Sequence, residues 1–459
     1  MSIENNLDIP EQTTSHPRYD AYNGSGVEWL GEIPESWQTI RLRFLLDTSP
    51  SKSEVKDRDP ESEVSFVPME SVGEDGGLDL SETKPLEQVI DGYTYFRDGD
   101  VVVAKITPCF ENGKGALAQE LENGVGFGTT ELHVLRPGQQ VDARFLFYAT
   151  MSYPFRKIGE STMYGAGGQK RVSDDFIQNL RWPIPPLPEQ RAIAAYLDRE
   201  TERIDALVEK KERLIELLEE KRTALISHAV TKGLDDDAEM KDSGVEWLGE
   251  IPAGWKVVRL KHVADVQGGI AKGKRYGDDA NTIMLPYLRV ANVQDGYMNL
   301  EEISEIEVTP EDAKRYALRD GDVLMNEGGD FDKLGRGAVW NGEIVPCLHQ
   351  NHVFAVRPEC IESDWLAQIT RTTYAKHFFI LRSVQSTNLA SISMSSLKEL
   401  PVVLPPAEER QRILQTVSQT ASRLETLIGK VRDGIARLKE YRTALISAAV
   451  TGQIDVRQQ

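Results

Sequence analysis

Cysteine is scarce in this chain, because only three of the 459 residues are cysteines and no two of them form a Cys-x-x-Cys pair. A disulfide framework and a zinc knuckle are therefore not encoded, and we interpret Cys109, Cys347 and Cys360 as small core residues. Long apolar runs are also missing, since none approaches the roughly 20 residues that a membrane helix needs. The segment Met1–Asp20 is polar and acidic, unlike a signal peptide. We expect a cytoplasmic protein with no membrane partner.

Positive charge is in deficit, with 53 Lys and Arg residues against 73 Asp and Glu residues and a net charge of -20. This balance argues against a protein that coats nucleic acid by bulk attraction. Any contact with nucleic acid must be local or shared with a partner. Apolar residues make up 40% and charged residues 27%, which is typical of a globular protein. The length favours about three folding units.

The sequence contains a two-fold internal duplication. Three segments return after about 220 residues, and the sequences between them diverge widely. The two halves therefore share a scaffold and differ in what their variable middles contact. The repeated segments are Gly26–Pro34 and Gly244–Pro252, Arg97–Val101 and Arg319–Val323, and Arg222–Ser227 and Arg442–Ser447.

Each half has a strand-rich middle and ends in a long helix. Turns with glycine lead into apolar runs, as at Gly99–Ala104, and proline stops others, as at Leu132–Pro137. The fold class is therefore α+β, with two β-rich domains in a pseudo-two-fold repeat separated by two long antiparallel coiled-coil helices. The predicted segments are a flexible arm at 1–25, β-rich domains at 26–187 and 244–405, and helices at 188–235 and 406–452.

Both long helices carry a heptad pattern in the same register, and each must bury its apolar stripe against another helix. The obvious partner is the other copy, in antiparallel orientation. At 1.5 Å per residue, the segment Glu189–Thr231 spans roughly 65 Å, enough to hold two domains apart. The predicted seam consists of Leu197, Ile204, Leu207, Leu214, Leu218 and Leu225 in the first helix, and Val417, Leu424, Leu427, Val431, Leu438 and Leu445 in the second.

Motifs for catalysis are incomplete. Gly268–Arg275 matches a phosphate-binding loop until Arg275 replaces the Ser or Thr that holds magnesium, so we interpret it as a basic loop. Cys347, His349 and His352 have metal-like spacing but precede a strand, and a loop is the better interpretation. A nuclease-like Glu54-Val55-Lys56 lies in a polar loop. Motifs for amino methylation and for dinucleotide or S-adenosylmethionine binding are missing. We predict no metal site and no cofactor in this chain.

Two basic patches occupy the same place in the repeat. Segment 144–181 contains six basic and three acidic residues, and segment 365–398 contains no acidic residue. A solvated face would explain either patch alone, but two matched patches in an acidic chain favour DNA contact. The candidate DNA-binding residues are Lys105, Lys114, Arg156, Lys157, Tyr164, Gln169, Lys170, Arg171, Lys333, Arg336, Arg371, Tyr374, Lys376, His377, Arg382, Gln385 and Asn388.

The chain resembles the specificity subunit of type I restriction-modification enzymes over nearly its whole length. The resemblance rests on the doubled Gly-Val-Glu-Trp-Leu-Gly-Glu-Ile-Pro, on Pro185–Ile193 and on the helix endings Thr223–Thr231 and Thr443–Thr451. One departure is that the second helix entry, Pro405–Ile413, lacks the usual Glu-Gln pair.

The resemblance implies that each variable middle recognises one half of a split sequence in double-stranded DNA and that the helices set the gap. It further implies no catalysis by this chain. Two methyltransferase subunits would dock on it and motor-nuclease subunits would join them. S-adenosylmethionine, ATP and Mg would then belong to these partners.

Two other classes of function stay open. The chain could be a coiled-coil scaffold whose two β-rich domains bind protein rather than DNA. An autonomous enzyme is disfavoured by the incomplete motifs.

Overall fold

The computed structural model describes residues 16–47, 50–165, 168–277, 279–329, 334–385 and 390–457. The chain forms two compact units: Met1–Glu212 with Arg432–Gln459, and Arg213–Val431. Each unit therefore contains one β-rich domain, the first half of one long helix and the second half of the other. Most of the predicted arm lies outside the described residues.

Unit 1 contains a four-stranded sheet in the order β5-β4-β9-β6 and a three-stranded sheet in the order β10-β7-β8, with two-stranded pairs β1-β2 and β11-β3. Its strands are β1 (Tyr22–Gly24), β2 (Glu32–Pro34), β3 (Gln38–Arg41), β4 (Glu63–Val67), β5 (Thr83–Pro85), β6 (Thr94–Arg97), β7 (Val101–Ala104), β8 (Gly115–Leu117), β9 (Val125–Gly128), β10 (Leu132–Leu135) and β11 (Arg181–Ile184). Its short helices are α1 (Leu86–Val89), α2 (Ala143–Met151), α3 (Tyr153–Ser161) and α4 (Asp174–Asn179).

Unit 2 contains sheets in the orders β15-β22-β18-β20, β17-β16-β21 and β19-β24-β23, with pairs β12-β13 and β14-β25. Its strands are β12 (Met240–Asp242), β13 (Glu250–Pro252), β14 (Lys256–Arg259), β15 (Ala264–Gly268), β16 (Ile283–Leu288), β17 (Ser304–Val308), β18 (Val323–Asn326), β19 (Gly328–Gly329), β20 (Gly337–Val339), β21 (Leu348–His349), β22 (Val353–Pro358), β23 (Val384–Gln385), β24 (Ala390–Ser391) and β25 (Pro401–Leu404). Its short helices are α6 (Pro310–Tyr316), α7 (Ser363–Thr370), α8 (Thr373–Arg382) and α9 (Met394–Leu397).

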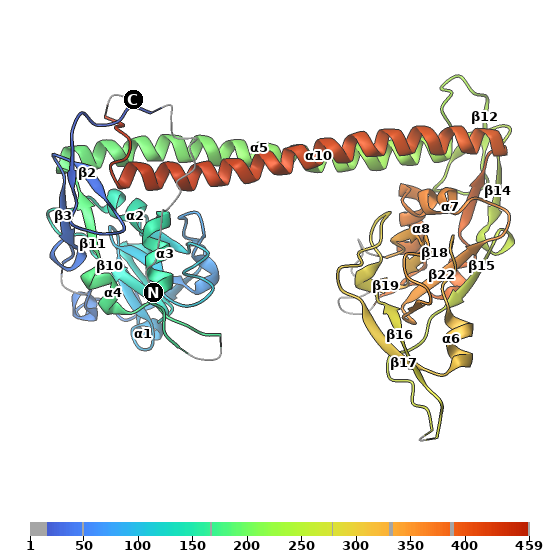
Figure 1. Cartoon of the computed structure of the whole chain (residues 1–459), viewed down its shortest axis with the longest axis horizontal. Helices are drawn as coiled ribbons and strands as arrows, with labels where there is room; N and C mark the ends of the chain where they lie inside the picture. Colours follow the sequence, from blue (N-terminus) through green and yellow to red (C-terminus); the bar gives the residue numbers. More distant parts are fainter. Residues whose placement is uncertain are drawn as a thin grey trace. The chain divides into compact units, whose positions relative to one another are not determined.

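The long helices are α5 (Leu187–Lys232) and α10 (Ala407–Val450) (Figure 1). They run antiparallel, because in unit 1 the start of α5 packs with the end of α10 and in unit 2 the end of α5 packs with the start of α10. Together with the two β-rich repeats, this confirms the predicted fold class. Among the described residues, no helix is long and apolar enough to cross a membrane.

The repeated Arg-Asp-Gly-Asp-Val segment precedes β7 and β18 and contains a buried charge. Asp100 is 1% exposed, and both its carboxylate oxygens accept hydrogen bonds of 2.8 Å from Arg136. Arg357 binds Asp322 in the same way in unit 2, with its Nε donating over 2.9 Å. Each pair joins the start of a central strand, β7 or β18, to the end of its neighbour, β10 or β22. This contact explains why the Arg-Asp-Gly-Asp-Val sequence is repeated.

The repeated Arg-Thr-Ala-Leu-Ile-Ser segment is a docking site for a β-rich domain. In unit 1, the backbone N–H of Tyr153 at the start of α3 donates to Ser447 Oγ of α10 over 3.0 Å. In unit 2, the N–H of Thr373 at the start of α8 donates to Ser227 Oγ of α5 over 2.9 Å. The first N–H groups of a helix have no partner within it, so each serine satisfies one of them. Each domain therefore docks on the helix that follows the other domain in sequence.

Each β-rich domain also contacts the start of its own long helix. Trp37 Nε1 donates to Glu189 Oε1 over 3.1 Å, and Trp255 Nε1 donates to Glu409 Oε2 over 3.0 Å. This pairing explains why a tryptophan closes both copies of the opening motif.

The second helix entry, Pro405–Ile413, holds the start of its helix with a different side chain from the first. Gln190 Nε2 donates to the carbonyl of Pro185 over 2.8 Å, and Arg410 Nη1 donates to that of Pro405 over 2.9 Å. The arginine therefore replaces the glutamine as the donor that holds the helix start.

The predicted seam is only partly buried. The prediction that every heptad position is buried is wrong for Leu207, Leu214, Leu225 and Leu427, whose exposed fractions are 41%, 41%, 40% and 43%. The physical reason is that the β-rich domains cover the helices from one side. Neighbouring positions such as Ile226 and Val230 face a domain and are buried instead. Leu424 and Leu438 are half-buried, and Leu197, Ile204, Leu218, Val417, Val431 and Leu445 are buried.

Arg136→Ala tests the buried pair. The substitution leaves the Asp100 carboxylate buried without its partner, and we expect a loss of stability of about 3–5 kcal/mol. Arg97→Ala is the matched control, because Arg97 is half-exposed and its ion pair with Glu54 should contribute less than about 1 kcal/mol. Urea denaturation of both variants measures the difference, and equal midpoints would contradict the prediction.

Candidate nucleic-acid interface

Two paired segments, residues 163–165 and 168–172, lie beside the chain that leaves β7, and we call them the first hairpin. Tyr164 and Arg171 exchange both backbone N–H···O bonds, at 3.2 and 2.9 Å. The N–H of Val172 donates to Lys105 O over 2.9 Å, and the N–H of Thr107 donates to Lys170 O over 3.0 Å. The hairpin is thus tied to the segment just after the central strand of the sheet.

Unit 2 contains the same arrangement in residues 383–385 and 390–392, which we call the second hairpin. Its strands β23 and β24 pair antiparallel, and β24 pairs with β19, the segment just after the central strand β18. The N–H of Ile392 donates to Glu327 O over 2.8 Å, as Val172 does to Lys105. The two hairpins therefore occupy equivalent places on equivalent strands.

The first hairpin presents side chains that can contact both bases and phosphates. The Tyr164 side chain is 65% exposed, and Gln169 and Lys170 are exposed. Arg171 Nη2 lies 2.7 Å from Glu131 Oε1, and this hydrogen bond holds the pKa of Glu131 below its usual value. An aromatic ring can stack, an amide can read base edges and an amine can hold a phosphate.

The second hairpin has a different chemistry on the same scaffold. Glu327 is the repeat equivalent of Lys105, so a carboxylate replaces an ammonium group at this position. The Glu327 carboxylate lies 2.8 Å from His352 Nδ1. Val384 in the hairpin is 73% exposed. The side chains of Asn388 and Gln385, which the sequence predicted here, lie outside the described residues, as does Lys333. Equivalent backbones with unlike side chains are suited to bind unlike targets.

Two other predicted residues, Lys114 and Arg336, are repeat equivalents near the hairpins. The N–H of Ala104 donates to Lys114 O and the N–H of Asn326 donates to Arg336 O, both over 3.0 Å. Both side chains are half-buried. Lys114 Nζ donates to the carbonyl of Met69 over 2.9 Å, so its ammonium group already has a protein partner.

The remaining exposed candidates lie on helices. On α3, Lys157 forms an ion pair with Glu160 at 2.8 Å. On α8, Lys376, His377 and Arg382 are exposed, and the His377 ring lies 6.3 Å from that of Trp247. Arg382 is the last residue of α8 and directly precedes the second hairpin.

Arg156 and Tyr374 are buried, so the prediction that they contact DNA is wrong. Arg156 is 8% exposed and donates to the carbonyls of Phe110 and Gly113 over 3.1 and 3.0 Å. Burial lowers its pKa to about 9. Tyr374 is 5% exposed, and its hydroxyl donates to the carbonyl of Pro401 over 3.0 Å.

Arg371 is also largely buried and is paired with Asp295, its Nε donating to the Asp295 carboxylate over 3.0 Å. Its side chain is 12% exposed. The Arg371 side chain therefore forms an internal ion pair of the domain and is not available on its surface to contact DNA.

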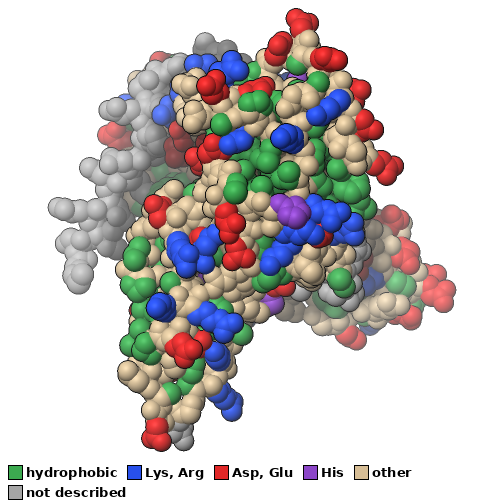
Figure 2. Space-filling model, turned by 90° about the vertical axis from the view of Figure 1, so that its right-hand side faces the viewer, with side chains coloured by type: hydrophobic (Ala, Val, Ile, Leu, Met, Phe, Trp, Pro, Cys, Tyr) green, Lys and Arg blue, Asp and Glu red, His purple; other side chains and the backbone are tan. Residues whose placement is uncertain are grey.

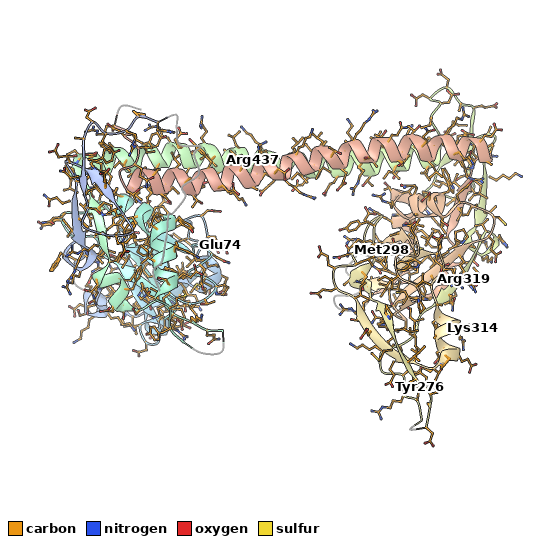
Figure 3. All side chains as sticks on the ribbon, viewed as in Figure 1. Glu74, Tyr276, Met298, Lys314, Arg319 and Arg437 are labelled. Carbon is orange, nitrogen blue, oxygen red and sulfur yellow. The ribbon has the colours of Figure 1, made fainter. Side chains whose placement is uncertain are left out.

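The glycine-rich segment Gly268–Arg275 is held against its own domain. A Cβ at Gly269 would lie 2.1 Å from the carbonyl oxygen of His349, so glycine is needed for close packing of two backbones. Lys274 Nζ lies 2.6 Å from Asp312 Oδ2, and this hydrogen bond lowers the pKa of Asp312. Figure 3 labels Tyr276, which follows this loop, and Lys314 on α6.

The three residues with metal-like spacing, Cys347, His349 and His352, do not share a partner. Cys347 is 1% exposed, and the Nδ1 of the fully buried His349 lies 2.7 Å from the carbonyl oxygen of Val353. His352 pairs with Glu327 instead. Over the described ranges, no group of three or more His, Cys, Asp or Glu residues could hold a metal ion.

Positive charge on unit 2 is local. Figure 2 shows the face that β14, β15 and α6 present at the right of Figure 1, where Lys and Arg side chains form separate groups among acidic and hydrophobic ones. Arg259 at the end of β14 and the nearby Lys261 both lie 2.7 Å from the Glu399 carboxylate. Such neutralised pairs agree with a surface that does not bind nucleic acid by bulk charge.

The chain matches a family model described as the type I restriction modification DNA specificity domain, at residues 34–217 and 252–433. It therefore belongs to this family, and it is a specificity subunit with two such repeats. The duplication of the model along the chain agrees with the duplicated hairpin scaffold.

Curated relatives match over almost the whole chain. The type I restriction enzyme EcoAI specificity subunit of Escherichia coli is 26% identical, over 91% of this chain and 83% of its own length. The MjaIX specificity subunit of Methanocaldococcus jannaschii is 24% identical, over 94% of this chain and 96% of its own length.

Solved structures share the fold. One is a chain from a study of complex assembly and conformational transition of the type I R-M system, with a TM-score of 0.69, 20% identity and coverage of 91% of this chain and 98% of its own. Another is the HsdS subunit from Thermoanaerobacter tengcongensis, with a TM-score of 0.51, 19% identity and coverage of 92% and 98%.

Lys170→Ala tests the first hairpin. If Lys170 holds a phosphate, its loss should weaken binding of the assembled complex to duplex DNA and reduce the slope of log affinity against log salt by about 0.9. Fluorescence titrations at several salt concentrations measure both quantities. Arg437→Ala on α10 is the control, and identical slopes for the two variants would contradict the assignment.

His349→Gln tests the buried imidazole. Burial lowers the pKa of His349 to about 4, whereas the unfolded chain takes up the proton near 6.5. The unfolded state then binds more protons between these values, so stability falls as pH falls, by about 2 kcal/mol between pH 7 and pH 5. We expect the glutamine variant to lose this part of the pH dependence in urea denaturation, and an unchanged dependence would contradict the assignment.

Proposed function

We propose that this chain is the non-catalytic subunit that selects the DNA target of a type I restriction-modification complex, with each β-rich domain recognising one half of a bipartite sequence. The observation that carries the proposal is the hairpin scaffold, which is built twice with the same backbone contacts and different side chains. Equal scaffolds place two recognition surfaces in equivalent settings, and unlike side chains give each surface its own target.

We further propose that two methyltransferase subunits dock on the long helices, that motor-nuclease subunits join them, and that the assembly is cytoplasmic. The support is the set of exposed leucines, because large apolar side chains that stay exposed on a solvated helix are typical of interfaces. On α5, Leu207, Leu214 and Leu217 are 41%, 41% and 46% exposed. Leu207 and its repeat equivalent Leu427 give two identical partners equivalent places to bind.

S-adenosylmethionine, ATP and Mg would bind to these partner subunits. What this chain contributes is selection: its hairpins favour one DNA sequence over the others, and its helices hold the subunits that carry out methylation.

Exchange of residues 256–400 for those of a relative tests the proposal. Because the second hairpin lies wholly within this segment, the methylated target of the assembled complex should change in one half only. Methylation mapping of host DNA reads both halves of the target at once. If both halves change, the modular account is wrong.

The same mapping separates the alternative of a protein-binding scaffold. A scaffold that does not contact DNA would leave both halves of the methylated target unchanged after the exchange.

A further inference from the structure

A single arginine joins three segments of unit 1. Arg442 of α10 donates from Nε to Asp205 Oδ1 of α5 over 3.0 Å. It also donates from Nη2 to the backbone carbonyl of Asp75, in a turn of the β-rich domain, over 3.0 Å. The Arg442 side chain is 12% exposed. One guanidinium therefore links both long helices to the domain that lies against them.

Unit 2 builds the same link from residues about 220 positions away in the repeat. Arg222 of α5 donates from Nη1 to Glu425 of α10 over 2.8 Å, and its Nη2 lies 3.4 Å from the carboxylate of Asp295. The Arg222 side chain is 19% exposed. Glu425 and Asp295 are the repeat equivalents of Asp205 and Asp75. We call each arginine with its two acidic partners an arginine link.

The turn that each link grips is packed tightly on its own domain. Gly76 has a φ of +108°, and a Cβ there would lie 2.4 Å from the Phe147 ring. Gly296 has a φ of +84°, and a Cβ there would lie 2.9 Å from Arg371 Cζ. Figure 3 labels Glu74 and Met298, which mark these two turns. Each turn therefore contacts the body of its domain at this glycine, so a bond to the turn also helps to position the domain.

The arginine link lies far along the helix from the tryptophan–glutamate bond at the helix start, which is one of several polar contacts between the domain and the long helices. Trp37 donates to Glu189 at the start of α5, and Asp205 follows 16 residues later, which is about 24 Å along a helix. The same interval separates Glu409 from Glu425. A contact this far from the start of the helix adds resistance to tilting of the domain on the helix pair, beyond that of the contacts nearer the helix start.

We propose that Arg442 and Arg222 are positioning residues that fix the tilt of each recognition domain and thereby set the spacer length accepted between the two half-targets. The proposal rests on the function proposed above. One added base pair moves a half-target by about 3.4 Å and rotates it by about 35° around the duplex. A domain held at a fixed tilt cannot follow this change, so it rejects the altered spacer.

The two links are unequal. In unit 2, Arg371 also donates to Asp295, over 3.0 Å, and holds the turn from the domain side. In unit 1, Met151 stands at the equivalent position and offers no such bond. Loss of Arg442 should therefore relax the spacer more than loss of Arg222.

Methylation of duplexes with the native spacer and with spacers one base pair shorter or longer tests the proposal in the assembled complex. For Arg442→Ala, we expect methylation at the altered spacers, relative to the native one, to rise about tenfold, which corresponds to about 1.4 kcal/mol. Arg222→Ala should give a smaller rise. Arg437→Ala, on the exposed side of α10 and labelled in Figure 3, is the matched control and should keep the native preference.

Arg442→Lys keeps a charged donor beside Asp205 and the Asp75 carbonyl, so it should retain more of the spacer preference than Arg442→Ala, a difference that a loss of folding alone would not produce. Asp205→Asn removes the ion pair with little change in shape. If Arg442→Ala fails to fold, the spacer preference is measured with this variant instead. An unchanged spacer preference, or an equal loss of methylation at every spacer, overturns the proposal. If the unaltered complex methylates no two-part target at all, the proposed function itself fails, and that result is seen before any variant is compared.

Discussion

The structure depends on one constraint: each β-rich domain must bury an apolar face that the start of its own long helix covers only in part. In unit 1 the missing cover comes from the end of α10, where Leu445, Ile446 and Val450 join the domain core. In unit 2 it comes from the end of α5, through Ile226 and Val230. Neither repeat is complete alone, so the duplication of the chain is a requirement of packing as well as of symmetric recognition.

This constraint explains where the repeated letters lie. The segments that recur are those that fasten a domain to a helix pair or close its central strands, such as the docking serines Ser227 and Ser447. The segments that diverge include the hairpins, whose backbone contacts repeat although their side chains do not. A common frame and variable recognition surfaces follow from the same pattern of contacts.

Much of the fold could be predicted from the sequence, because its signals are local. Prolines at the helix entries and glycines at the exits, Gly233 and Gly452 with φ of +85° and +77°, bracket helices that end within about three residues of the predicted bounds. Buried strands such as β10, β22 and β25 could be found because each is a short apolar run that ends at or just before proline. The repeat itself needed only comparison of the chain with itself.

The candidate site could be predicted only in part, because burial and long-range contact are not local. Counting charges along the sequence assigned Arg156 and Lys170 to the same DNA-binding patch. In the structure Arg156 lies beneath a loop, whereas Lys170 faces solvent. The heptad pattern also could not show that a third element covers the helices from one side. Glu131 and its repeat equivalent His352 each directly precede an apolar strand, and alignment of the two halves could have found this pair.

Methylation mapping of the host genome with this chain present and with it deleted tests the central claim most directly. The account predicts that one bipartite motif, with two specific parts at a constant separation, is methylated only when the chain is present. A motif that is continuous, or a pattern of methylation that does not change on deletion, would contradict it.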